Sequence, residues 1–336
     1  MKIRKLLSVG LVALLFSACS EQEEIVANGD DGFCTISLDA GRSVEVDTRA
    51  VSGNEDVINN VWVVQLNADG TAALVPPQYF ASVTDSKIKV KLKKEQSTVH
   101  LLVNTGKADL FDPAAALSTF TTAAVTGKQL TATGDWNTAL THMAMYGTLT
   151  GTPGSKAAAD LTRALAKVNI TVVNSTSGKL SISSMQLKNV PNVQYIATPS
   201  GTYPAATGTY LNYTSITTNF TNTYTWYVSE NCRGTGVGRY ETEKAAANVT
   251  AGSYAMYYEI KGKYDGLNVV YTFYLGGNNT NNYNVVRNTN YTMTITISGV
   301  NEADARVVID ATKLSVTSNT GGSFSDGGSE TVIGTM

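Results

Sequence analysis

The chain has 336 residues, a formal net charge of −2 and a hydrophobic fraction of 43%, so it is long enough for two medium-sized domains and lacks the basic excess of a nucleic-acid-binding protein. Charged residues make up only 15%, whereas Gly, Thr, Asn and Tyr are frequent, which is typical of an exported protein built from β-strands. The three cysteines are too few for a disulfide framework.

The N-terminal segment predicts export as a lipoprotein. Basic residues within Met1–Lys5 precede a short apolar run, Leu6–Phe16, which is the pattern of a signal peptide and is too short to remain as a membrane-spanning helix. Small residues then lead to Cys19 and an acidic run. We therefore expect residues 1–18 to be removed and Cys19 to carry the lipid. The alternative is an ordinary secretory signal with Cys19 near the cut by chance.

The first predicted strand is Phe33–Asp39, in which Cys34, Ile36 and Leu38 share one face and polar residues occupy the other. Each apolar side chain contributes roughly 1.5–3 kcal/mol when fully buried. Removing this strand would therefore leave an apolar groove flanked by unpaired backbone groups. Cys34 is interpreted as a small buried hydrophobe that forms no disulfide with Cys232.

A possible processing site follows this strand. The bond between Arg49 and Ala50 lies where an extended region runs into the polar stretch Ser52–Asp56, and exposed loops of this kind are preferred by proteases. Considered alone, a single arginine in a loop is more often simply solvated. An Arg-specific cut at this bond therefore needs further support.

The next predicted elements are three strands and one helix. Val57–Gln65 contains a continuous apolar strand, Ser86–Leu92 alternates apolar residues with lysines, and Val99–Val103 is apolar throughout, as in a central strand. The helix is expected within Lys107–Thr119, because Asp112 can cap it and the following proline suits a first helical turn.

A Gly/Pro-rich turn at Thr150–Ser155 marks a predicted domain boundary. The second half continues with apolar runs, alternating segments and a hairpin turn at Asp265-Gly266. The expected strands are Ala166–Val172, Leu180–Val190, Tyr224–Val228, Tyr254–Tyr264, Leu267–Leu275 and Asn290–Ser298.

The sequence offers no catalytic or metal-binding pattern. Its only histidines, His100 and His142, are isolated and more often packed or surface residues than ligands. No Cys/His spacing suggests zinc. Gly234–Gly238 lacks the strand–helix context of a phosphate loop and is interpreted as a turn. We therefore predict no catalytic residue, metal or cofactor.

The three tryptophans bear on a possible carbohydrate platform. Trp62 and Trp226 lie within apolar strands and are expected in the core. Trp136 follows Gly134-Asp135 in a polar stretch and is the better candidate for exposure. A glycan-binding surface lipoprotein, which would use exposed aromatics, therefore stays open as an alternative. A secreted β-sandwich enzyme, which would need converging carboxylates, stays open as well.

Several of these segments together resemble the fimbrillin family, the type V pilins of Gram-negative anaerobes. Each piece is short, but their order and spacing run through nearly the whole chain. The matching elements are the lipobox ending at Cys19, the Arg49-Ala50 loop, Met143–Gly147, Arg163–Val168, Tyr227–Asn231 and Val286–Tyr291.

The resemblance implies two tandem transthyretin-like β-sandwich domains, residues 50–155 and 156–336, behind a lipidated propeptide, residues 19–49. In this family the precursor reaches the outer membrane as a lipoprotein, and an Arg-specific protease, here cutting after Arg49, removes the N-terminal strand. A C-terminal segment of another pilin subunit then fills the groove, so that the extracellular fimbrium grows by donor-strand exchange. The implied role is structural and adhesive, not enzymatic. The expected partners are other pilin subunits, the protease and a surface receptor.

The donor segment is expected between Arg306 and Met336, but neither half of it alternates cleanly. This C-terminus is Gly/Ser-rich and lacks the tryptophan of better-known stalk members, so a tip or anchor role is the alternative to a stalk role. The donor candidates are Val307, Ile309, Leu314, Val316, Val332 and Ile333.

Overall fold

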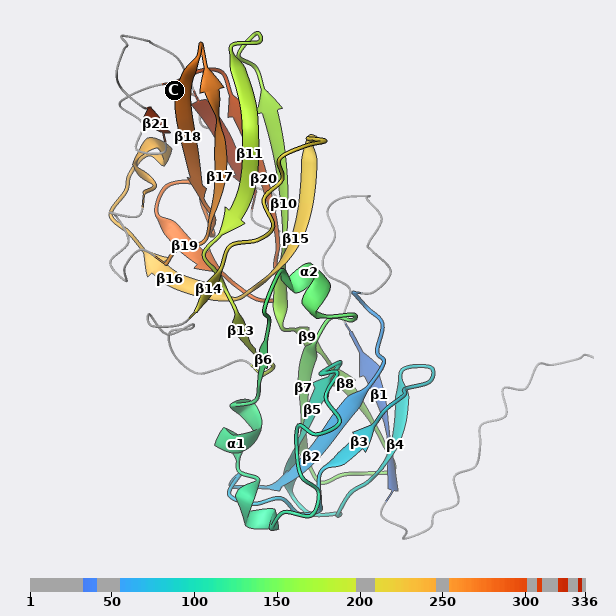
Figure 1. Cartoon of the computed structure of the whole chain (residues 1–336). Coiled ribbons are helices and arrows are strands. Elements are labelled where there is room, and N and C mark those ends of the chain that lie inside the picture. Colours follow the sequence, from blue (N-terminus) through green and yellow to red (C-terminus); the bar gives the residue numbers. More distant parts are fainter. Residues whose placement is uncertain are drawn as a thin grey trace, which may run out of the picture. The chain divides into compact units, whose positions relative to one another are not determined.

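Figure 1 shows the computed structural model of the chain. It describes residues 33–40, 55–197, 209–245, 254–300, 307–309, 320–325 and 332–333. Nearly all regular structure is β-strand, which confirms the predicted all-β class with a minor helical content. The helical segments of the described residues are short, namely η1 (Leu117–Thr119), α1 (Thr122–Thr126), α2 (Trp136–Ala139) and η2 (Glu241–Glu243).

The first large sheet has five antiparallel strands in the order β3-β2-β5-β7-β9. Its middle strand is the continuous apolar run, in which Leu101, Leu102 and Val103 are fully buried, as predicted for a central strand. The strands are β2 (Val61–Asn67), β3 (Gln78–Phe80), β5 (Ser97–Val103), β7 (Met145–Gly151) and β9 (Thr162–Arg163).

A three-stranded sheet shares one apolar core with the five-stranded sheet. Its order is β4-β1-β8, with β1 at Phe33–Asp39, β4 at Lys87–Lys91 and β8 at Lys156–Asp160. Ile88 and Val90 of β4 are buried, whereas its three lysines are exposed. The lysines therefore form the solvated face of a half-buried strand, as their alternation predicts.

Most of the remaining strands form two larger sheets. The turn Asp265-Gly266 joins β17 to β18 with positive φ at both residues, 47° and 88°, which is the conformation of a tight hairpin turn. One sheet has the order β15-β10-β20-β22-β23 and the other β11-β17-β18-β21. The strands are β10 (Leu165–Asn174), β11 (Leu180–Lys188), β15 (Thr223–Ser229), β17 (Tyr257–Tyr264), β18 (Leu267–Tyr274), β20 (Asn290–Ile297), β21 (Val307–Ile309), β22 (Thr320–Ser325) and β23 (Val332–Ile333).

Short two-stranded ribbons complete the fold. One of them pairs a segment that follows α1 with a segment that follows β11, so strands distant in sequence are tied together here. The ribbons are β6 (Gln129–Thr131) with β13 (Val193–Tyr195), β12 (Val190–Pro191) with β14 (Tyr210–Leu211), and β16 (Asn231–Thr235) with β19 (Asn282–Val285).

The helix predicted within Lys107–Thr119 is wrong. Asp112 Oδ1 accepts a hydrogen bond from the amide of Ala114 at 2.9 Å, which closes a local turn where we expected a helix cap. Only the 3-10 turn η1 forms in this stretch. The cap of α1 is instead Thr121, whose side chain accepts a hydrogen bond from the amide of Ala124 at 3.2 Å. The Asp-Pro signal therefore marks a turn, because no amphipathic helical face follows it.

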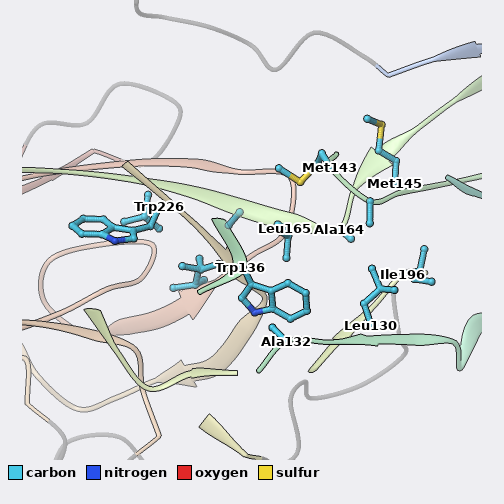
Figure 2. Close-up of a cluster of buried hydrophobic side chains, with 14 of the residues drawn as sticks. Leu130, Ala132, Trp136, Met143, Met145, Ala164, Leu165, Ile196 and Trp226 are labelled. Atoms are coloured by element: carbon cyan, nitrogen blue, oxygen red, sulfur yellow. The ribbon is translucent and has the colours of Figure 1, made fainter. Parts of the chain in front are cut away.

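The predicted exposure of Trp136 is also wrong. Its side chain is 1% exposed, and its indole Nε1 donates a hydrogen bond to the carbonyl of Pro191 at 2.9 Å. Figure 2 shows Trp136 within an apolar cluster that includes Leu130, Leu165 and Ile196. A glycan platform built on Trp136 is therefore excluded, because both the ring and its polar atom are already used inside the protein.

His100 is the buried histidine of the pair, and the core location predicted for Trp62 and Trp226 is confirmed. His100 faces Val64 across β2 and β5, and its Nδ1 lies 2.7 Å from the hydroxyl of Tyr146. Burial lowers the pKa of His100 from 6.5 to about 4, because the charged imidazolium loses its hydration in the core.

We expect acid to destabilise the protein through His100. The unfolded chain protonates this histidine below pH 6.5, whereas the folded chain does so only near pH 4, so this stability is present above pH 6.5 and is lost as the pH falls toward 4. Urea unfolding at pH 7 and pH 4 should show a loss roughly 3 kcal/mol larger in the wild type than in His100→Gln. His142→Gln is the control. An equal loss in His100→Gln and the wild type would contradict this assignment.

Candidate functional site

The strand β1 is the central strand of its sheet and is held on both sides. It pairs antiparallel with β4 and parallel with β8. Flanking backbone hydrogen bonds continue both ladders: the amide of Leu38 donates to Ser86 at 2.8 Å, and the amide of Thr35 donates to Ser155 at 2.9 Å. Figure 1 shows β1 between its two partners. Without β1, both neighbouring strands would become open edges.

The inward side chains of β1 fill an apolar groove. Cys34, Ile36 and Leu38 are 2%, 0% and 5% exposed, so the predicted strand with one buried face is present. Cys34 lies opposite Val90, and Ile36 lies opposite Ile88. Full burial of these three side chains contributes roughly 5–9 kcal/mol, as an upper bound. The groove is thus a large apolar surface that needs an occupant.

The outer face of β1 is only lightly covered. Phe33 is 40% exposed, and the ammonium group of Lys89 lies 5.1 Å from the centre of its ring. A cation over an exposed ring contributes about 0.5–1 kcal/mol, which is small beside the inward burial. The inward face therefore dominates the attachment of β1.

After β1, ion pairs and hydrogen bonds next hold the chain at Glu55 and Asp56. Glu55 is 6% exposed, and its carboxylate accepts a hydrogen bond from the hydroxyl of Tyr227 and lies 3.0 Å from the ammonium group of Lys167. Arg163 pairs with Asp56 and donates to the backbone carbonyl of Glu55 at 3.3 Å. The carboxylate of Glu55 and the guanidinium of Arg163 are buried, although Asp56 is exposed, and a buried charge that loses its partner is costly. The chain from residue 55 onward therefore has its own attachment, independent of β1.

Sequence reasoning missed this Glu55 cluster. Its members Glu55, Arg163, Lys167 and Tyr227 come from distant parts of the chain, and no local spacing links them. The one available signal was Lys167, a charged residue inside an alternating strand. Half-buried lysines of this kind usually have a partner, but the sequence does not say which one.

A second buried ion pair joins two segments that carry the family resemblance, Tyr227–Asn231 and Val286–Tyr291. Glu230 and Arg287 are 6% and 5% exposed, and Nε of Arg287 donates to the Glu230 carboxylate at 3.0 Å. Nη1 of Arg287 also donates to the carbonyl of Ile196 at 3.1 Å. The two motifs are therefore structural partners that hold β16 and the segment before β20 together.

The donor candidates lie at sheet edges where they are described. Val307 and Ile309 belong to β21, which pairs only with β18, and Val332 and Ile333 belong to β23, which pairs only with β22. The other predicted site residues lie outside the described residues. They are Cys19, Arg49, Ala50, Leu314 and Val316.

The structure also bears on the cysteines, the Gly-rich segment Gly234–Gly238 and the expected lack of a metal site. Cys34 and Cys232 are both free cysteines, and burial raises the pKa of each thiol. Gly234 has a φ of 79° inside β16, at the register shift between Cys232 and Thr235, so the start of the predicted turn Gly234–Gly238 belongs to a strand. Within the described ranges, no cluster of His, Cys, Asp or Glu suits a metal ion. No helix there has the length and apolarity to cross a membrane.

Comparison with known proteins identifies one matching family model and several solved structures with a similar fold. Residues 226–295 match a family model described as a domain of unknown function, DUF4906. A search of curated proteins found no match.

Solved structures give longer matches. A candidate cell adhesion protein from Parabacteroides distasonis is 13% identical with a TM-score of 0.60, covering 88% of this chain and 96% of that one. A fimbrilin from Porphyromonas gingivalis is 12% identical with a TM-score of 0.55, covering 83% and 96%. The tip fimbrial protein Mfa3 of the same species, truncated at its C-terminus, is 15% identical with a TM-score of 0.53, covering 88% and 99%. The chain therefore has a fimbrillin-like fold.

Proposed function

We propose that this chain is a structural subunit of a type V pilus, exported as a lipoprotein and polymerised by donor-strand exchange, and that the resulting fimbrium supports adhesion. The observation that carries the proposal is β1. It is a single strand, buried along one face between β4 and β8, and the chain is attached independently again at Glu55. Such a strand can be exchanged without dismantling the rest of the fold.

The proposed maturation begins with lipidation at Cys19 and delivery to the outer membrane. An Arg-specific protease then cuts between Arg49 and Ala50, in the segment between β1 and the Glu55 cluster. The cut removes the covalent link to residues 19–49, so β1 can leave with its lipid. The emptied groove exposes apolar surface and two strand edges, which favours the addition of a new strand.

The chain would consist of two β-sandwich domains in tandem. The pairing of β8 with β1 and of β9 with β7 supports a division between Arg163 and Leu165, slightly after the predicted boundary of 155/156. The chain would act as a scaffold with no enzymatic activity, and its partners would be other pilin subunits. A tip role is a second candidate, because one of the similar structures is a tip fimbrial protein.

Replacing Arg49 tests the processing step. Arg49→Ala should leave a folded, lipidated monomer that does not polymerise, because β1 stays covalently attached and fills its own groove. Gel mobility of surface material and electron microscopy of fibres would measure the outcome. Arg42→Ala, which changes another arginine of the same segment, is the matched control and should process normally. Fibres of Arg49→Ala with residues 33–39 still attached would overturn exchange through this groove.

Replacing Cys19 tests the lipid anchor. Cys19→Ala should abolish labelling with a radioactive fatty acid and delivery to the surface, because the acyl chains that hold the precursor in the membrane are lost. Cys232→Ala changes a cysteine within the fold and should be labelled like the wild type. Normal labelling of Cys19→Ala would show that residue 19 is not the lipidated cysteine.

A further inference from the structure

The groove of β1 has a space at its Cys34 end that the described residues leave unfilled. A pocket of about 160 Å³ opens there. Its apolar wall consists of Cys34, Leu92, Val99, Leu149 and Ala157. The end of β7, the turn that follows it and Lys156 at the start of β8 supply the remaining lining. Cys34, Leu92 and Val99 are each less than 5% exposed, so the floor of the pocket belongs to the core.

The identity of residue 34 explains why the space is empty. Cys34 is the smallest of the three inward side chains of β1, and it occupies the register position beside the pocket. An engineered apolar cavity of about 150 Å³ holds a benzene molecule. The pocket can therefore accept a side chain as large as a branched aliphatic group or an aromatic ring, and β1 does not provide one.

We propose that this pocket is a socket for a bulky apolar side chain of the strand that replaces β1, supplied by the C-terminal segment of a second copy of this chain. The inference rests on the proposed exchange of β1. A replacement strand that fills the socket buries apolar surface that β1 leaves uncovered, at about 25 cal/mol per Å². β1 therefore binds the groove less tightly than a strand whose side chain fills the socket. This difference favours the replacement of β1.

The edge position of β23 supports the choice of occupant. Among the described strands, β23 pairs with β22 alone and lies at the end of its sheet. It can leave without separating any other pair of strands. An occupant of the groove must also be an extended strand, because both β4 and β8 offer backbone hydrogen bonds to it.

Two adjacent alanines of β8 allow a matched test on the accepting subunit. Ala157 is half-buried and lines the pocket, whereas Ala158 is exposed and does not. Ala157→Leu should fill the socket from the side of β8 without changing β1 or the donor. After cleavage with a trypsin-like protease, Ala157→Leu subunits should form at least tenfold fewer fibres than Ala158→Leu subunits, as counted by electron microscopy.

A second pair of variants keeps the test valid if Ala157→Leu misfolds. Cys34→Leu should raise the thermal midpoint of the uncut precursor by about 2–4 °C, since it fills a cavity, and β1 should remain bound for longer after the cut. Ser37→Leu, on the opposite face of β1, should do neither.

The outcomes separate the two proposals. Normal polymerisation of a folded Ala157→Leu variant, or no gain in stability for Cys34→Leu, would overturn the socket while leaving strand exchange in place. If cleaved wild-type subunits form no fibres at all, the proposed function itself fails.

Discussion

The burial of β1 between β4 and β8 is the constraint on which the first part of the structure depends. A central strand satisfies backbone groups on two neighbours at once, and its inward side chains cover the apolar residues beneath them. Ile36 is completely buried, although it belongs to a segment that precedes the rest of the described fold. The sheet is therefore complete only while some strand occupies this position.

The Glu55 cluster contains no residue of β1. The Glu55 cluster attaches the chain just after the segment that joins it to β1, and the Glu230–Arg287 pair acts in the same way within the later strands. Buried ion pairs contribute little net stability, but breaking one is costly. Rearranging the chain at Glu55, or at Glu230 and Arg287, would therefore leave a buried charge without its partner.

The sequence predicted the strands well and the tertiary contacts poorly. The alternation in β4 and β20 is a local signal, because neighbouring residues face opposite sides of a strand. The buried state of Trp136 depends on Pro191, and the Glu55 cluster depends on Arg163 and Tyr227. Such contacts join residues that are distant in the chain, so no spacing rule reveals them. The expected helix failed for a similar reason, since Asp112 makes a turn as readily as a cap.

The parallel pairing of β1 with β8 has a consequence for the order of folding. Thr35 lies beside Lys156 in this ladder. Because β1 is synthesised well before β8, it cannot be fully paired until β8 has been made. Closing so long a loop is entropically unfavourable before other contacts have formed. Until then β1 can pair on one side only, with β4, so the later partner β8 completes the sheet.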